Sequence, residues 1–166
     1  MALNFYCAFT LNGTALDGDS TMNEIGGVDV SADHIEGYKL TFGTRVGTEG
    51  QSHRASSHRR ILPVRINKRI DATTPLLYQG LKENQRLDGD IKIFDTDPDD
   101  GATRHRFTVR ITQARILGIE SQVPDAFDAD ESNRPPSEVL ELVPHTIAYV
   151  DEINSSEFED NWQTGV

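Results

Sequence analysis

The segment GTRVGTEGQSHRASSHRR, residues 43–60, gathers the side chains of this chain that most readily suggest chemistry. In it, Ser52–His53 and Ser57–His58 each place a hydroxyl nucleophile next to a possible general base. Neighbours in sequence rarely adopt the geometry of a catalytic triad, and the chain contains no G-x-S-x-G nucleophile elbow. A hydrolase is therefore a distant alternative, and we expect a protein that is not an enzyme.

A calcium loop is the second chemical possibility, in DTDPDDG at residues 95–101, because carboxylates at alternate positions can converge on a hard cation. The EF-hand register fails, since Asp100 stands where glycine is required and Arg106 stands where the bidentate glutamate belongs. A polar hairpin turn is favoured instead. The five histidines form no H-E-x-x-H motif, and a lone cysteine, Cys7, cannot build a structural zinc site. No metal or cofactor is expected.

Nucleic-acid binding is the alternative from another class. The segment 43–60 holds four arginines and a single acid, Glu49, and clustered arginines neutralise phosphates. The same segment has no aromatic side chain on which bases could stack, and the whole chain has a net charge of −11. We therefore expect no nucleic-acid partner. A titration of nucleic-acid binding against salt tests this expectation.

Charge is divided unevenly along the chain. Residues 1–118 carry 15 acids and 15 bases, whereas residues 119–166 carry 12 acids and one base, Arg134. Residues 50–70 contain six bases and no acid. This division predicts complementary surfaces that meet, either within one chain or between copies.

Length and composition bound the class of protein. A chain of 166 residues with 36% hydrophobic residues is typical of one globular domain, and it has no run of about 20 apolar residues that would cross a membrane. The start, MALNFYCAFTLNG, lacks the basic region of a signal peptide. We expect synthesis in the cytoplasm, no stable membrane insertion, and export only by a dedicated machine. Cys7 has no partner for an internal disulfide and is expected to be buried in a strand.

Alternation of apolar and polar residues predicts about eight short strands. The main segments are FYCAFTL (5–11), YKLTF (38–42), ILPVRINKRI (61–70), DIKIF (90–94), RHRFTVRI (104–111), ARILGIE (114–120) and VLELVPHTIAYV (139–150). A short helix is predicted at about residues 74–84, with Thr74 as its cap, Pro75 in its first turn and a close backbone contact at Gly80. The predicted fold is mainly β, an antiparallel β-barrel or two-sheet sandwich with one helix. Residues 1–150 would form the domain and residues 151–166 a loosely held acidic tail.

The segment SHRRILPVRINKRIDATTPLLYQGL, residues 57–81, resembles the central signature of the Hcp family, the tube proteins of bacterial type VI secretion systems. In that signature a strand ending in Lys…Ile-Asp runs into a short helix that opens with Ser/Thr-Pro. The matching positions here are Lys68, Ile70, Asp71, Thr74, Pro75 and Leu77. Weaker matches follow the family order in LDGDSTMNEIGGVDVSAD, FTVRITQARILGIES and VLELVPHTIAYV. The chain departs from the family at Ala148 and Tyr149, where a Trp is usual, and in residues 43–60, 121–137 and those after 151.

The resemblance implies a structural role. Six copies would form a ring, and rings would stack into a tube inside a contractile sheath, capped by a spike protein and propelled out of the cell with effectors in its lumen. Phage and tailocin tail-tube proteins share this architecture and are the alternative within the class. In the family a long loop at the place of residues 43–60 reaches neighbouring subunits. The self-assembly residues expected here are Arg45, His53, Arg54, His58, Arg59, Arg60, Arg65 and Lys68.

Overall fold

Thirteen strands and one helix make up the described part of the chain in the computed structural model. The structure describes residues 2–48 and 55–162, and for residues 48 and 55–58 it describes the backbone alone. The strands are β1 (Phe5–Leu11), β2 (Thr14–Ala15), β3 (Glu24–Ile25), β4 (Val28–Asp29), β5 (Ile35–Thr41), β6 (Thr44–Thr48), β7 (Ala55–Ile61), β8 (Val64–Arg69), β9 (Arg86–Thr96), β10 (Thr103–Gln122), β11 (Ser137–Val143), β12 (Thr146–Asp151) and β13 (Ser156–Asn161). The helix α1 is Thr74–Lys82.

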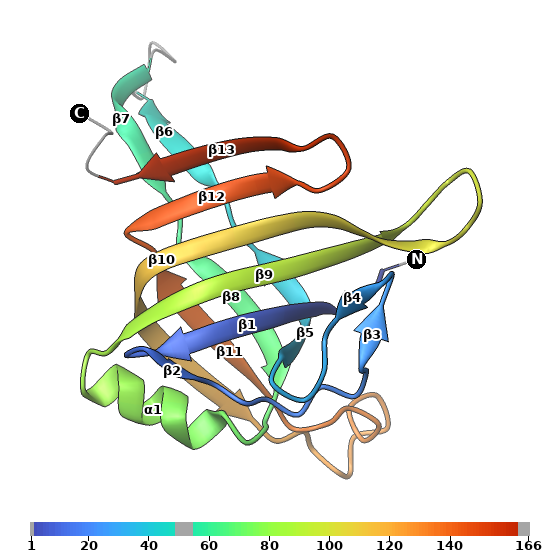
Figure 1. Ribbon diagram of the computed structural model, residues 1–166. Coiled ribbons are helices and arrows are strands. Elements are labelled where there is room, and N and C mark those ends of the chain that lie inside the picture. Colours follow the sequence, from blue (N-terminus) through green and yellow to red (C-terminus); the bar gives the residue numbers. More distant parts are fainter. Residues whose placement is uncertain (1, 49–54, 163–166) are drawn as a thin grey trace.

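The largest sheet closes on itself as an antiparallel barrel (Figure 1). Its strand order is β11-β8-β5-β1-β9-β10, and β10 pairs with β11 to complete the ring of strands. Beyond this ring, β12 pairs with the first half of β10, and β13 pairs with β12. The sequence prediction of a mainly β, antiparallel barrel with one short helix is confirmed.

Strand β10 closes the barrel because it bends. Its residues up to Thr112 pair with β9 and β12, and from Arg115 onward it pairs with β11. The pairing with β9 is interrupted between Ile111 and Ala114, where Gln113 has a φ of 52° and its N–H donates to Asp88 Oδ1 at 2.7 Å. The sequence predicted two separate strands here, whereas the structure has one strand of 20 residues.

The barrel interior holds the alternating apolar residues that the sequence placed on one face. In β1, Phe5, Cys7, Phe9 and Leu11 all belong to the main core. Burial raises the pKa of the Cys7 thiol well above its usual range, so this thiol stays protonated and unreactive. Tyr6, on the opposite face of β1, is also buried and packs edge-to-face against Phe94 at 6.0 Å between ring centroids. The outside of this part of the barrel is therefore covered too.

Gly89 in β9 is required by close approach of another strand. It lies opposite Phe9 of β1 with a φ of +152°, and a Cβ there would stand 2.1 Å from the Ala8 carbonyl oxygen. We expect Gly89→Ala to lower the free energy of unfolding by at least about 2 kcal/mol, measured by urea denaturation. The matched control is Gly118→Ala in β10, where a Cβ meets nothing within 4 Å. A Gly89 variant as stable as the Gly118 variant would contradict this account.

Helix α1 packs across one end of the barrel (Figure 1), with Leu77 and Gly80 buried. A Cβ at Gly80 would come within 2.8 Å of Leu11 Cδ2, so the predicted close contact at this glycine is confirmed. The prediction that Thr74 caps the helix is wrong, because the N-cap is Thr73 and no side chain caps the helix. The helix also ends at Lys82, two residues earlier than predicted. Among the described residues, no helix has the length and apolar character needed to cross a lipid bilayer.

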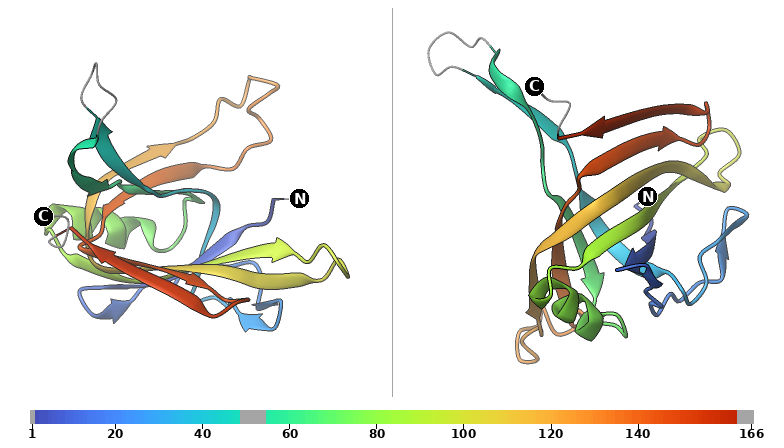
Figure 2. Two further views of the ribbon diagram at one scale, coloured as in Figure 1. Left: turned by 90° about the horizontal axis from the view of Figure 1, so that it is seen from above. Right: turned by 60° about the vertical axis from the view of Figure 1, so that its left-hand side comes forward.

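Two segments differ from the sequence expectation. Residues 43–60 were expected to be a loop, but β6 and β7 pair as a separate two-stranded sheet, here called the arm, which projects from the barrel (Figures 1 and 2). Residues 49–54 lie outside the described residues. Residues 151–166 were expected to be loosely held, but β13 pairs with β12 through six residue pairs. Its sequence, SEFEDN, is too polar to reveal a strand by alternation, and its order comes from the backbone of β12.

Candidate assembly surfaces and the buried ion-pair network

Lys68 is the centre of a buried ionic network where β8 runs into α1. Alternation along β8 turns its side chain inward, and it is completely buried. Its ammonium lies 2.6 Å from Glu138 Oε1 and 2.8 Å from Asp71 Oδ1, and it donates to the Arg69 carbonyl at 3.0 Å. All three donor positions of the ammonium therefore have acceptors.

The carboxylates of the network are satisfied from other elements. Glu138 of β11 lies directly opposite Lys68 in the β8–β11 pairing, and it accepts hydrogen bonds from Thr74 Oγ1 at 3.0 Å and Ser121 Oγ at 3.2 Å. Asp71 accepts from the Thr73 N–H at 2.9 Å. The network thus ties β8, β10 and β11 to the first turn of α1. Among the described residues, no buried polar side-chain atom lacks a partner.

This network explains in physical terms why three of the signature residues occur together, whereas Ile70 is 40% exposed and lies outside it. Lys68, Asp71 and Thr74 bond to it directly, and Leu77 is buried in the core one turn later. Lys68 was expected among the self-assembly residues, but a completely buried side chain presents nothing to another subunit. Lys68 therefore belongs to the subunit interior.

The arm is tied to the C-terminal strand of the same chain. Arg59 of β7 donates from Nε to Asp160 Oδ2 at 2.9 Å and from Nη2 to Asp160 Oδ1 at 2.6 Å. The Asp160 carboxylate is 3% exposed, and the hydrogen bonds from Arg59 hold its pKa below the usual range. Arg65 of β8 similarly lies 3.0 Å from Glu141 of β11. The basic segment and the acidic region therefore meet within one chain, in one of the two ways that the charge division predicts.

The remaining predicted self-assembly residues lie along the arm. Arg45 of β6 stands directly opposite Arg60 of β7, and both side chains are exposed. His58 lies in β7, but its side chain is outside the described part of the structure. His53 and Arg54 lie outside the described residues. The structure thus groups Arg45 and Arg60 on the arm, and it separates them from Lys68.

The carboxylates of residues 95–101 are used inside the chain. Arg104 donates to Asp95 at 2.8 Å and to Asp97 at 2.9 Å, and the backbone forms the expected hairpin turn between Asp97 and Ala102. Over the described residues, no three His, Cys, Asp or Glu side chains are grouped so that they could hold a metal ion. Asp95 and Asp97 therefore fix the hairpin between β9 and β10.

Two histidines that the sequence did not single out are built into the packing. His34 lies between Asp33, at 2.6 Å from Nδ1, and Lys92, at 2.9 Å from Nε2. His105 stacks on Phe94, and burial lowers its pKa. Bonds from Lys92 to both His34 Nε2 and the Asp29 carbonyl attach β4 to the barrel.

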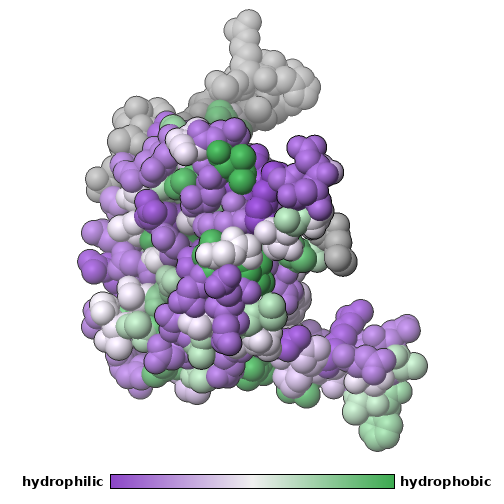
Figure 3. Space-filling model, turned by 45° about the vertical axis from the view of Figure 1, so that its right-hand side comes forward, coloured by the Kyte–Doolittle hydropathy of each residue, from purple (hydrophilic) through white to green (hydrophobic). Residues whose placement is uncertain are grey.

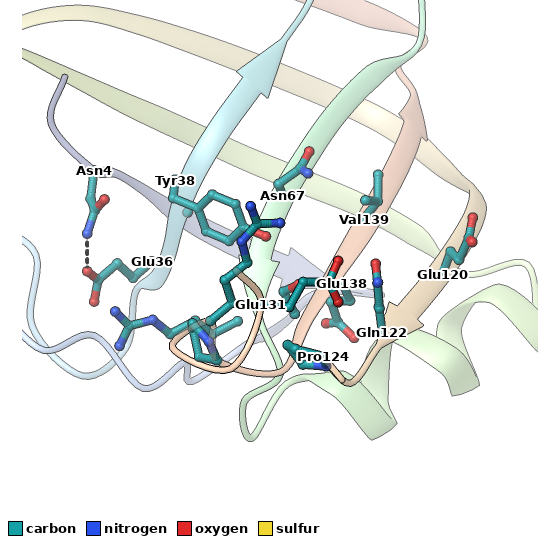
Figure 4. Close-up of a pocket in the computed structure, with 15 residues that line it drawn as sticks. Asn4, Glu36, Tyr38, Asn67, Glu120, Gln122, Pro124, Glu131, Glu138 and Val139 are labelled. Atoms are coloured by element: carbon teal, nitrogen blue, oxygen red, sulfur yellow. Dashed lines mark hydrogen bonds between the residues drawn. The ribbon is translucent and has the colours of Figure 1, made fainter. Parts of the chain in front are cut away.

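A cleft of about 620 Å³ lies between β5, β8, β11 and the loop of residues 123–136 (Figure 4). Its lining carries charges of both signs and Tyr38. Glu36 at one end is held by Asn4 at 2.5 Å and by the Thr21 hydroxyl at 2.8 Å. The residues lining it include neither histidine nor cysteine, and its polar side chains come from Glu, Asn, Gln, Arg, Ser and Tyr.

Comparison with known proteins agrees with this arrangement. Residues 10–149 match the model of the family described as "Type VI secretion system effector, Hcp". The chain belongs to the Hcp family. The resemblance found in the signature segment is thereby confirmed, and with it a role in type VI secretion as a tube or effector protein.

Solved Hcp structures share the fold over nearly the whole chain. One crystal structure of an Hcp protein is 21% identical, with a TM-score of 0.82 and coverage of 96% of this chain and 97% of the other. A variant of Hcp1 from E. coli EAEC 042 gives 18% identity, a TM-score of 0.81 and coverage of 97% and 99%. The secreted protein Hcp3 from Pseudomonas aeruginosa is 18% identical, with a TM-score of 0.69 and coverage of 95% of this chain and 99% of the other. Comparison of the sequence with curated proteins gives no significant match.

Proposed function

We propose that this Hcp chain is a structural, non-enzymatic subunit that closes into hexameric rings and that these rings stack into the inner tube of a type VI secretion machine. Sheath contraction expels the tube, a spike protein caps it, and effector proteins travel in its lumen. The observation that carries the proposal is the family match over residues 10–149, together with a fold shared with Hcp structures over 96% of the chain.

Open strand edges support self-assembly. In the described chain, β13 pairs only with β12, and β6 and β7 pair only with each other. Unpaired edges invite pairing with other chains, and an isolated two-stranded hairpin is marginally stable in water. Neighbouring copies that cover these edges would stabilise the arm and β13 together. Contacts of this head-to-tail kind close into rings when the rotation between copies permits.

The surface is compatible with contacts made at several places. On the face shown in Figure 3, hydrophilic residues predominate and hydrophobic ones form separate small areas. Strand pairing with buried apolar residues would then supply most of the affinity between copies. Exposed ion pairs contribute only about 0–1 kcal/mol each, so charge chiefly sets orientation. We place Arg45, Arg59 and Arg60 in this orienting role, whereas Arg65, paired with Glu141 of its own subunit, has a local role in the barrel.

Electron microscopy and light scattering of the purified protein test the proposal. Uniform annular particles with the mass of six subunits are expected. A protein that remains monomeric at high concentration and low ionic strength would exclude it. The neighbouring genes separate a secretion tube from a phage or tailocin tail tube. Filter binding against salt separates both from a nucleic-acid binder, which shows a steep salt slope.

A further inference from the structure

The arm carries a pair of like charges that its own chain does not neutralise in the described residues. Arg45 and Arg60 are directly opposite each other in the β6–β7 pairing, a position where like charges destabilise a sheet. No described acid lies within ion-pair distance of either guanidinium, in contrast to neighbouring Arg59, which has Asp160. Val46, next to Arg45, is 47% exposed. Successive side chains of a strand point to opposite faces, so Val46, which pairs with Arg59, lies on the other face from Arg45 and Arg60. One face of the arm therefore presents two guanidinium groups side by side.

A complementary surface lies in the loop of residues 123–136. Phe127 is 100% exposed, and Asp125, Asp128 and Asp130 surround it in sequence. The loop is held in shape by its own hydrogen bonds: the Phe127 N–H donates to Asp125 Oδ1 at 2.9 Å, and the Ser132 N–H donates to the Asp128 carbonyl at 2.8 Å. In the described chain no Lys or Arg forms an ion pair with these three aspartates.

Scattered exposed apolar residues need no explanation on a protein surface. Phe127 differs because it has no covering side chain at all and sits on a backbone that is already fixed. A rigid aromatic presented in this way binds with little loss of conformational entropy, as interface anchors do. The acids around it define the partner as basic.

The two surfaces project from opposite ends of the barrel. Figure 1 places the arm, β6 and β7, at one end and the loop between β10 and β11 at the other, and the view from above places both on the same side of the barrel (Figure 2). When subunits repeat along this direction, the arm of one copy faces the loop of the next. The same chain therefore carries both halves of a head-to-tail contact.

We propose that the loop of residues 123–136 receives the arm of a second copy and that this is the axial contact between stacked rings. Asp125, Asp128 and Asp130 accept hydrogen bonds from Arg45 and Arg60, which relieves the repulsion between the two guanidinium groups. The Phe127 ring packs against the face of one of these guanidinium groups. The inference rests on the proposed ring assembly and adds to it the receiving surface.

Charge exchange between the two surfaces tests the inference. The arm variant is Arg45→Glu with Arg60→Glu, the loop variant is Asp125→Lys with Asp128→Lys, and the third protein combines all four substitutions. Sedimentation and electron microscopy count single rings and stacked rings. Each one-sided variant is expected to form rings but to lower stacking by about tenfold or more, and the combined variant is expected to restore it. Stacking of the wild type should also weaken as salt is raised.

Matched controls separate this contact from general effects of charge or apolar surface. Asp99→Lys with Asp100→Lys reverses two exposed acids at the β9–β10 turn, and Leu117→Ala removes another exposed apolar side chain. Both should stack as the wild type does, whereas Phe127→Ala should stack poorly. The inference is overturned when the one-sided variants stack normally, when the combined variant does not recover, or when wild-type rings never stack. A wild type that forms no rings would instead reject the proposed function, and the inference with it.

Discussion

Replacing Lys68 with methionine is expected to lower the free energy of unfolding by about 3–5 kcal/mol, because it leaves buried carboxylates without their cation. Glu138 is fully buried and Asp71 is 8% exposed, so water cannot replace the ammonium. Chemical denaturation followed by circular dichroism measures the loss. Methionine keeps most of the side-chain volume, which makes the missing charge the main change.

Arg65→Met provides the control for this expectation. Arg65 lies on the same strand and also pairs across to β11, with Glu141 at 3.0 Å, but its side chain is 56% exposed. An exposed ion pair of this kind contributes about 0–1 kcal/mol. A Lys68 variant no less stable than the Arg65 variant would show that the network does not stabilise the fold.

A double variant separates the effect of the buried ion pair on stability from the effect of side-chain shape at the same site. Lys68→Met combined with Glu138→Leu removes both charges, and replacement of a buried ion pair by apolar residues is often close to neutral. We expect this double variant to recover more than half of the loss. Full recovery is not expected, because Asp71 remains and the Thr74 hydroxyl loses its acceptor.

Alternation of apolar residues and the helix-start signal were enough to predict the core strands and the helix, because these depend on short stretches of sequence. Alternation placed Cys7 and Phe9 in the core of β1, and the Thr-Pro pair located the start of α1 within one residue. The bend of β10 was missed because Gln113 carries no turn signal, although it adopts a φ of 52°. That conformation is imposed by closure of the barrel and by the hydrogen bond to Asp88.

The sequence indicated which segments supply the basic and acidic residues of the candidate site, but not which of these residues pair with one another. The sequence showed that bases of residues 50–70 and acids of residues 119–166 should meet, and register then decides which of them do. Lys68 meets Glu138 because β8 and β11 are antiparallel neighbours, a pairing fixed only when β10 bends to bring β11 into the barrel. Arg59 and Asp160 are 101 residues apart, and β13 has too few apolar residues to be recognised as a strand.

Reversing Arg59 to glutamate is expected to leave a folded subunit that no longer assembles. The Arg59–Asp160 pair joins the arm to β13, two elements with open strand edges, so it fixes the angle at which those edges are presented. Two carboxylates in place of the pair would push the arm and β13 apart. Loss of hydrogen bonds to a charged group costs about 1.5–3 kcal/mol in one subunit. Six such pairs in a proposed ring would make the effect on assembly much larger than on folding.

Light scattering at low ionic strength measures this effect as the fraction of protein in rings. Arg59→Glu and Asp160→Arg should each give mainly monomers with unchanged circular dichroism, and the two substitutions together should restore rings. Arg65→Glu, which disturbs an exposed pair on β8, should assemble almost as the wild type does. Assembly of the Arg59 variant at the wild-type level would show that the arm needs no tie to β13.

The same pair gives the contact a defined dependence on pH. The pKa of Asp160 is lowered in the folded chain by the hydrogen bonds from Arg59, so the folded state binds this proton less readily than the unfolded chain. Its contribution to stability is therefore complete above the unfolded value of about 3.9 and is lost as the pH falls through the lower folded value. Asp160→Asn removes this dependence, whereas the wild type should lose arm order only at acid pH, which hydrogen exchange of the β7 and β13 amides measures. Because the carboxylate stays ionised throughout the neutral range, pH changes within that range should leave the tie between the arm and β13 intact.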